Sequence, residues 1–531
     1  MKEGFLLLNK QIDVKRALAL ARAFTFMCSC ARGCVLPFLT LYFRQLGLPP
    51  AMTGVVMGTK HLITLVWRPM ASLLSKHYNK RRVVITGSLV CSAAVAIVLL
   101  LIQPADMHMQ TSTCNMSGAP AQNLVVGNPG EPNITRNKMF KLDSGSGEKT
   151  TEEEKHKEYS LDFLSNLKAM DSQHQLFFLI LITMSLWECA SAPLEWTADD
   201  GLYEYLDYAD ASDGYSSSGV WALLGAACGV GGAGLLVSQL SCFIAGETPR
   251  SALHFYCYAA VATLALPVAA YLPLYLNKKQ DRANGLLKAV QLVRGSPRAL
   301  LCAITTLLVG VVGSAVDDFL LWQMQDHGSS ELHMGLSQAL ALLSQAAFPL
   351  LAGRVSGLLS PGRVLAVGAT SIGLQCFYYS FLWGPWAALP AQVLSCFGNG
   401  AILWAVKVQC EDVAMPGAER NMMRVYIALS LHLGSGLGSF VGGLVVQRFG
   451  LTWLFRGAAV GLILWCVCLP LLQWNAPRQH RINYSRLLAA DASETSDSES
   501  EQERDWLNKA MEDDKSNNNY GRRFKPLNGT G

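Results

Sequence analysis

Apolar residues along this chain gather into twelve stretches of membrane-spanning length, separated by mostly short polar turns. A helix needs about 20 residues to cross a hydrocarbon core of about 30 Å, and in lipid its backbone must satisfy its own hydrogen bonds. The pattern therefore predicts an all-α membrane protein whose transmembrane helices cover 18–43, 52–75, 82–103, 175–197, 219–241, 252–276, 299–322, 334–359, 363–385, 386–410, 422–446 and 451–473.

A hydrophilic loop, 277–298, separates the sixth stretch from the seventh and divides the chain into two halves. We expect two six-helix bundles, 18–276 and 299–473, joined by this central cytosolic loop. Residues 1–17 form a cytosolic N-terminus. The acidic, serine-rich segment 474–531 is expected to be a disordered cytosolic tail that is open to phosphorylation.

Lysine and arginine set the expected orientation, because they concentrate in the short loops on the cytosolic side of a membrane. With the N-terminus in the cytosol, basic residues fill almost every short inner loop, whereas the short outer loops hold only Arg44, Arg250 and Arg448. The inner loop from Asp199 to Asp213 is the exception, since it is acidic, and we interpret it as a solvated surface. Plasma membrane and endomembranes both remain open as locations.

The long polar segment 104–174 then lies on the lumenal or extracellular side. It carries two N-glycosylation sequons, at Asn115 and Asn133, and its composition predicts disorder. Cys114 and Cys242 both fall on this oxidising side, so a disulfide between them is one possible pairing. Sequons at Asn483 and Asn528 fall in the cytosolic tail and are expected to stay unmodified.

Composition narrows the function classes. Of the 531 residues, 51% are hydrophobic and only 15% are charged, and the net charge of +4 indicates no nucleic-acid partner. The sequence contains no nucleophile, phosphate-binding or metal-binding motif. We therefore expect no enzyme, no cofactor and no metal, and the lipid bilayer is the first partner.

Ionisable residues inside the spans are the candidates for function, because charges in hydrocarbon are costly and usually face the bundle interior or a solute pathway. The candidate pathway or coupling residues are Arg32, Lys60, His61, Glu188, Asp317, Asp318 and His432. Together they predict a polar cavity at the midline of the membrane.

Several interpretations of these residues remain open. Arg32 and Glu188 have opposite charges at similar depth, and they could form either a structural ion pair or a gating pair. Lys60 could extend its ammonium outward instead of contacting a solute. Asp317 and Asp318 point about 100° apart, so at most one faces the cavity. His432 could be a satisfied interior histidine or a proton carrier.

Glycines recur at close-packing intervals in the fifth and eleventh spans. Gly434, Gly438 and Gly442 lie four residues apart and form a stripe that lets another backbone approach closely. The fifth span carries a similar set between Gly225 and Gly234. These spans are each the fifth of their half, which is the kind of internal symmetry that transporters show. Rigid packing and a rocking interface are both consistent with the stripes.

The junctions after the second and eighth spans each run from a helix proline to a basic turn, and here the chain resembles the major facilitator superfamily. In the first junction, Lys80, Arg81 and Arg82 keep the basic end of the family's loop signature. Ser72 and Lys76 replace its first glycine and its aspartate. The acidic residue that would latch the inner face is therefore missing from this loop.

A narrower resemblance is to the branch around major facilitator superfamily domain-containing protein 6, and most strongly to its 6-like members. Three segments carry it: Pro37 to Leu48, Phe319 to Trp322 with Gly328 and Gly335, and Tyr215 with Trp221 and Gly225. The resemblance spans roughly 15–475 and implies the major facilitator fold.

The resulting hypothesis is secondary transport of an unidentified small solute by alternating access, with protons as a candidate coupling ion. The alternative is a non-transporting cell-surface receptor or adaptor on a transporter scaffold, with a protein ligand at the outer loop. Loss of solute flux on neutralising the buried charges would favour the first.

Overall fold

The computed structural model describes residues 2–78, 80–102, 151–208, 218–240, 243–244, 248–249, 251–274, 282–413 and 419–475. The chain divides into two units, 1–477 and 478–531, and all described residues belong to the first. Most of the expected tail 474–531 therefore lies outside the described residues, as do both outer-loop sequons.

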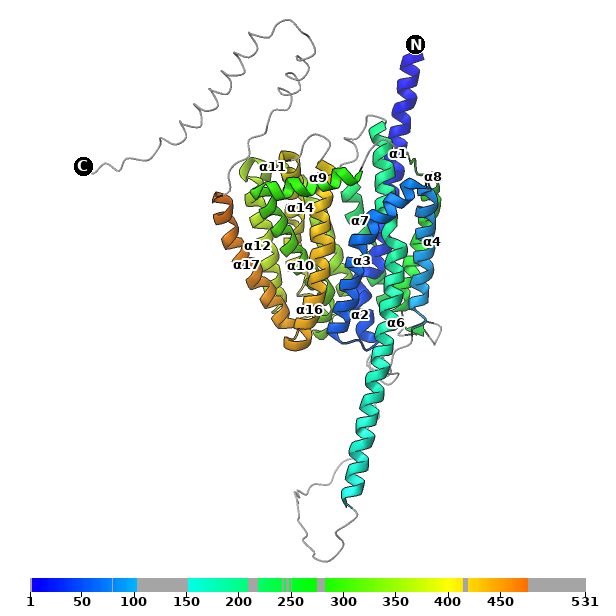
Figure 1. Ribbon diagram of the computed structural model, residues 1–531, viewed down its shortest axis with the longest axis vertical. Coiled ribbons are helices and arrows are strands. Elements are labelled where there is room, and N and C mark those ends of the chain that lie inside the picture. Colours follow the sequence, from blue (N-terminus) through cyan, green and yellow to red (C-terminus); the bar gives the residue numbers. More distant parts are fainter. Residues whose placement is uncertain are drawn as a thin grey trace, which may run out of the picture. The chain divides into compact units, whose positions relative to one another are not determined.

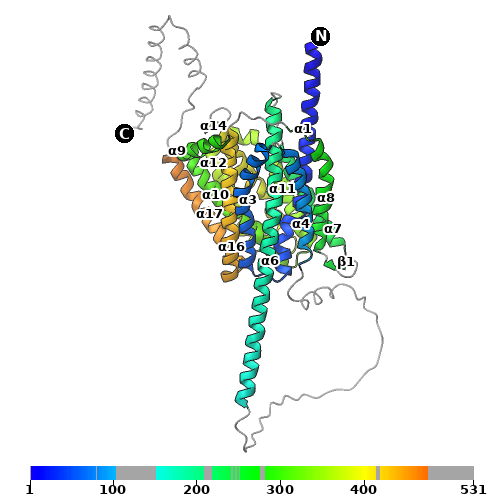
Figure 2. The ribbon, with the colours of Figure 1, turned by 45° about the vertical axis from the view of Figure 1, so that its right-hand side comes forward.

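The described residues of the first half are almost all helical. Its elements are α1 (Lys2–Val35), η1 (Leu36–Phe38), α2 (Leu39–Gln45), α3 (Pro50–His77), α4 (Arg81–Leu99), α6 (Thr151–Tyr208), α7 (Ser218–Gln239) and α8 (Ala252–Tyr271). One antiparallel pair of two-residue strands, β1 (Phe243–Ile244) and β2 (Thr248–Pro249), lies between α7 and α8, with Phe243 opposite Pro249. It is labelled in Figure 2.

The second half repeats the pattern of long helices. Its elements are α9 (Arg282–Gly295), α10 (Pro297–Asp326), α11 (Glu331–Leu358), α12 (Pro361–Tyr379), α13 (Leu389–Gln392), η5 (Val393–Cys396), α14 (Asn399–Val413), α15 (Glu419–Ile427), η6 (Ala428–Gly434), α16 (Ser435–Phe449) and α17 (Leu451–Asn475). The segment η6 is a turn of π-helix between α15 and α16, so these three elements together form one interrupted span.

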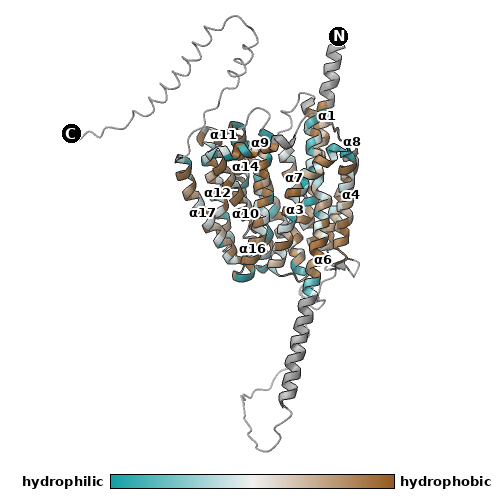
Figure 3. Ribbon diagram, viewed as in Figure 1, coloured by the Kyte–Doolittle hydropathy of each residue, from teal (hydrophilic) through white to brown (hydrophobic). Residues whose placement is uncertain are grey.

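Ten helical segments among the described residues are long and apolar enough to cross a membrane. Helices α3 and α12 supply the remaining two predicted spans and run alongside the others in Figure 1. Lys60, His61 and Arg68 lower the hydropathy of α3. In Figure 3 the helices are predominantly brown, the colour of hydrophobic residues, as expected for surfaces that contact lipid.

Several boundaries differ from those predicted. Helix α6 already begins at Thr151, inside the segment expected to be disordered, and it extends into the predicted acidic loop as far as Tyr208. The central loop contains α9, whose apolar residues Ala289 and Val293 are buried against the second half. Pro37 lies in the 3-10 turn η1 that separates α1 from α2, because proline cannot donate the helical hydrogen bond.

Two faces of the helical bundle are used below. The N-terminal face is where α3 ends at His77 and α4 begins at Arg81, and the opposite face is where α2 ends at Gln45 and α3 begins at Pro50. In Figure 1 the N-terminal face is at the top and the opposite face is at the bottom.

The two halves meet along two helix pairs, α3 with α16 and α7 with α11. Each fifth helix uses glycines on both of its contact sides. In α7, Gly229 lies against the backbone of Cys30 in α1, while Gly234 lies against Gly335 of α11. In α16, Gly438 lies against Val311 of α10, while Gly443 lies against Gly54 of α3. The pseudo-symmetry expected from the sequence therefore extends to the packing partners.

The predicted stripe on α16 faces its own half. Gly434 approaches the carbonyl oxygen of Leu307, and a Cβ on Gly442 would meet Ala315, both on α10. The contact with the other half is made by Gly436 and Gly443. An apolar cluster near the opposite face also joins the halves, since Phe38 and Leu41 pack with Phe319 and Leu320.

Candidate functional site

Two arginines from different helices share one glutamate inside the first half. Nη1 of Arg32 (α1) lies 2.6 Å from Oε1 of Glu195 (α6), and Nη2 of Arg68 (α3) lies 3.1 Å from Oε2 of the same carboxylate. Arg32 also donates to the backbone oxygen of Ser191, at 3.2 Å. Each carboxylate oxygen thus accepts from one guanidinium group, which fixes three helices around one acidic group.

Glu188 interacts electrostatically with Arg32, but the direct ion pair of Arg32 is with Glu195. Oε1 of Glu188 accepts a hydrogen bond from the hydroxyl of Thr64, at 2.5 Å. Glu188 and Glu195 lie seven residues apart, which places them on the same side of α6 two turns from each other. Arg32 pairs with Glu195, because its guanidinium group lies at the turn of α6 that holds Ser191 and Glu195.

Lys60 connects this site to the second half. Its side chain is only 8% exposed, which contradicts the interpretation in which it extends outward. Lys60 interacts electrostatically with Glu188 of α6 and with Asp318 of α10. Asp318 is buried beside Ser439, whereas Asp317 is exposed, so the two adjacent aspartates diverge as helix geometry requires.

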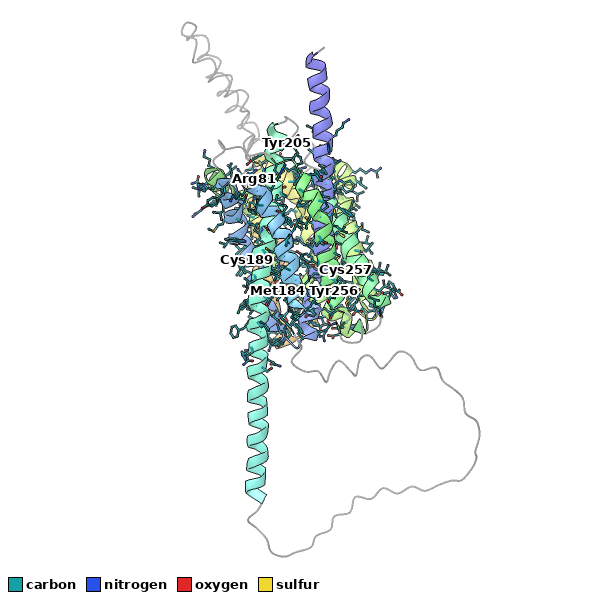
Figure 4. All side chains as sticks on the ribbon, turned by 90° about the vertical axis from the view of Figure 1, so that its right-hand side faces the viewer. Arg81, Met184, Cys189, Tyr205, Tyr256 and Cys257 are labelled. Atoms are coloured by element: carbon teal, nitrogen blue, oxygen red, sulfur yellow. The ribbon has the colours of Figure 1, made fainter. Side chains whose placement is uncertain are left out.

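His432 lies in the π turn η6 and faces the same charged groups from the second half. It is 5% exposed, and it interacts electrostatically with Arg68, Glu195 and Arg32. His61 of α3 lies close to His432 and to the backbone of Leu431. We call the set Arg32, Arg68, Glu195 and His432 the midline cluster. Cys189, the residue after Glu188, is labelled near mid-height of the bundle in Figure 4.

A second charged group bridges the halves at the N-terminal face. Nη2 of Arg420 (α15) lies 2.6 Å from Asp199, and Arg424 pairs with Asp200, both at the end of α6. Arg420 stacks over Tyr203, with its Cζ 3.9 Å from the ring centroid, and Arg424 lies over Trp196. The interpretation of this acidic segment as a solvated surface is therefore wrong for Asp200, whose side chain is fully buried.

The same acidic segment of α6 supplies the acidic partners that the loop between α3 and α4 lacks. The hydroxyl of Ser72 donates to Asp200 at 2.6 Å, and Nη1 of Arg81 lies 2.9 Å from Glu204. Nζ of Lys76 lies 3.7 Å from the same glutamate. Figure 4 places Arg81 and Tyr205 near each other at the N-terminal face. We call Asp199, Asp200, Arg420 and Arg424 the N-face bridge.

Sequence reasoning missed Arg68 and Glu195. Both lie in predicted spans, and spacing offered a signal, because Arg68 follows Lys60 by two turns and Glu195 follows Glu188 by two turns. Among the residues that the structure describes, no group of His, Cys, Asp or Glu could hold a metal ion. The predictions for Asn115, Asn133, Cys114 and Cys242 lie outside the described residues.

Comparison with known proteins identifies the family. Residues 18–457 match the MFS_1 like family. The chain is 46% identical to the zebrafish (Danio rerio) protein "Major facilitator superfamily domain-containing protein 6-like", over 98% of this chain and 99% of the other. The human (Homo sapiens) protein with that description is 36% identical, over 96% and 99%.

Solved structures share the fold at low sequence identity. The nucleoside transporter NupG matches with a TM-score of 0.60 at 12% identity, covering 86% of this chain and 98% of NupG. A bacterial homologue of the lysosomal transporter Spinster, in an inward-facing and occupied conformation, matches with a TM-score of 0.57 at 14% identity, covering 86% and 96%. The chain therefore belongs to the major facilitator superfamily, within the MFS_1 like family, and has its multi-pass membrane fold.

Proposed function

We propose that this protein is a secondary transporter that moves a small solute across a membrane by alternating access. The observation that carries the proposal is the midline cluster, in which charged groups of both halves face one another in the middle of the bundle. Such groups are expensive inside hydrocarbon and typically mark a solute or ion pathway. A scaffold that only displays an outer loop does not require them.

Contacts between the halves also suit alternating access. The halves are held by the N-face bridge at one end and by glycine contacts at the other. Side-chain ion pairs and close backbone contacts can each form or separate as the halves rotate, with the midline cluster between them. This supports a rocking motion around a fixed central site.

The charges suggest the character of the solute and of the coupling. Arg32, Arg68 and Lys60 favour an anionic or polar solute. Glu188, Asp318 and His432 are the candidates for proton coupling, with Asp318 taking the place of the exposed Asp317 because it lies inside, next to Lys60. One charge moved through the membrane field is worth about 2.3 kcal/mol per 100 mV, so one proton could drive useful accumulation.

For orientation, we propose that the N-terminal face is cytosolic. The basic residues of the short loops on that side support this assignment. Enzymatic deglycosylation of single Asn→Gln variants tests it. Glycans are expected on Asn115 and Asn133, and a glycan on Asn483 would reverse the orientation.

Solute uptake into proteoliposomes, measured against a broad panel, tests the transport proposal. Uptake of at least one solute is expected, and Arg68→Gln should abolish it. Arg363→Gln is the matched control, because Arg363 is an exposed arginine at the start of α12, and this variant should keep full uptake. No uptake of any solute would favour the receptor alternative, and full uptake by Arg68→Gln would mean that transport does not depend on the midline cluster.

A further inference from the structure

Arg456 of α17 is a charged residue of a transmembrane span that lies outside the midline cluster. Among the residues that the structure describes, it forms no ion pair and no side-chain hydrogen bond, and its buried Nε atom has no partner. A charge within a transmembrane segment is costly unless it is paired or reaches the interface. The described part of the chain thus provides no counter-ion for Arg456, although the position of this residue calls for one.

Arg456 faces the lipid side of α17. Val460, Ile463 and Val467 follow it by four, seven and eleven residues, so they share its side of the helix. All three are exposed. Exposed apolar side chains along a transmembrane helix contact the bilayer, and the half-buried Arg456 lies at the end of the same row.

Two exposed aromatic rings flank the guanidinium group. Cζ of Arg456 lies 5.0 Å from the ring centroid of Phe381, just beyond the end of α12. It lies 5.8 Å from the ring of Trp453, which precedes it by one turn of α17. Attraction between the cation and the ring faces holds the guanidinium group in place, whereas the N–H donors at its edge stay available for an anion.

The depth of Arg456 corresponds to the boundary between hydrocarbon and headgroups. Helix α17 begins at the opposite face, because the preceding helix α16 ends there beside the start of α3 (Figure 1). Arg456 is five residues from this start, which is about 8 Å along the axis. The helix has 25 residues and exceeds a hydrocarbon core of about 30 Å by about 8 Å. The guanidinium group is therefore within reach of lipid headgroups.

We infer that Arg456 binds the phosphate group of a membrane phospholipid in the leaflet at the opposite face. A phosphodiester carries one negative charge, and its oxygens accept paired hydrogen bonds from the fork of donors that arginine presents. The rings of Phe381 and Trp453 pack beside the lipid and restrict the arginine. The site is independent of the proposed transport pathway, because it lies on the lipid-facing surface of the second half.

Native mass spectrometry of the full-length protein, released from maltoside micelles, tests this inference. The probes are phosphatidylcholine and phosphatidylglycerol, which both contain a phosphodiester, and diacylglycerol and inorganic phosphate as the two parts taken separately. Both phospholipids should bind saturably, and diacylglycerol should bind at least tenfold more weakly. Equal binding of diacylglycerol would overturn the inference, and so would retention of inorganic phosphate in place of the lipid.

Variants connect the binding to Arg456. Arg456→Gln should weaken the apparent affinity for the tightest-bound phospholipid by about tenfold or more, as expected for lost hydrogen bonds to a charged group. Arg456→Lys keeps the charge without the planar fork and should recover only part of the affinity. Arg448→Gln is the matched control, because Arg448 is an exposed arginine in the last turn of α16 at the same face.

The control should keep the affinity of the unmodified protein within about twofold, which is less than the change expected for one lost hydrogen bond. Unchanged phospholipid binding by Arg456→Gln, or an equal loss in Arg448→Gln, would show that Arg456 does not form the site. If Arg456→Gln does not fold, the comparison between phospholipids and diacylglycerol in the unmodified protein still decides the question.

Discussion

The interface between the two halves, here called the seam, is held by different kinds of contact at the N-terminal face and at the opposite face. At the opposite face, backbones meet directly: an ideal Cβ on Gly443 would lie 2.6 Å from the carbonyl oxygen of Pro50 and 2.9 Å from the Cα of Gly54. At the N-terminal face, long side chains span the gap, and Arg424 reaches the fully buried Asp200. One end depends on the absence of side chains and the other on their length.

This difference teaches how each end can respond to movement. Dispersion contacts between backbones weaken strongly within about 1 Å of separation. The glycine contacts at the opposite face are therefore lost once the helices move apart by a small distance. Ion pairs between long side chains tolerate small shifts, and Tyr203 and Trp196 hold the arginines in place. We expect the N-face bridge to break by exchange of partners and the glycine end to break by separation of helices.

The largest expected effect is at Asp200. Asp200→Asn removes the buried acid and leaves Arg424 without its main partner, which should cost about 3–5 kcal/mol of stability. Denaturant unfolding in mixed micelles measures the loss. Asp199→Asn is the matched control, because the neighbouring Asp199 side chain is 38% exposed and should cost about 1 kcal/mol or less. Equal losses for the two variants would mean that burial does not distinguish these acids.

A smaller effect is expected at the glycine end. Gly443→Leu forces a side chain between α16 and α3 and should cost about 1–3 kcal/mol, together with most of the solute uptake. The measurements are melting temperature in detergent and flux in proteoliposomes.

Gly461→Leu in α17 serves as the control, since a Cβ there would meet nothing within 4 Å. It should match the unmodified protein in both measurements. If Gly443→Leu and Gly461→Leu behave alike, the two halves do not need the close backbone contact at the opposite face.

The smallest effect is expected at the ion pair of the opposite face. Nη2 of Arg44 lies 2.6 Å from Asp326, but these side chains are 34% and 42% exposed. Arg44→Gln should therefore cost only about 0.2–1 kcal/mol, and added salt should reduce the difference. A loss as large as that of Asp200→Asn would show that ion pairs matter equally at both ends of the seam.

The fold could be predicted from sequence because lipid imposes a simple rule on each span. Even α3, with Lys60, His61 and Arg68, was found from its length and its mainly apolar residues. The helical structure of the acidic end of α6 was not predicted, because the local sequence around Asp199, Asp200 and Glu204 is typical of a loop. Their partners Arg420 and Arg424 lie more than 200 residues away in the sequence, and the local pattern does not contain them.

The candidate site was predicted in part. Depth in a span indicated that Arg32, Lys60, Glu188 and His432 belong to the interior, since depth follows from counting residues. The sequence did not show which of the two acids pairs with Arg32, because Glu188 and Glu195 lie on the same side of α6, two turns apart. Which of them meets Arg32 depends on the vertical offset between α1 and α6, and hydropathy does not determine that offset.

The π turn η6 has a consequence for how one transmembrane span can serve both ends of the seam. Successive α-helical residues rotate by about 100°, so in a continuous helix Gly443 would sit about 100° around the axis from Arg424. A π turn inserts about one extra residue into the path, which removes that rotation and brings the two into phase. The span can thus present arginines to the first half above the turn and glycines to it below. Deleting one residue of Ala428–Gly434 other than Ser430, His432 or Gly434 would rotate one set away from its partners while leaving the arginines and the glycines themselves in the chain.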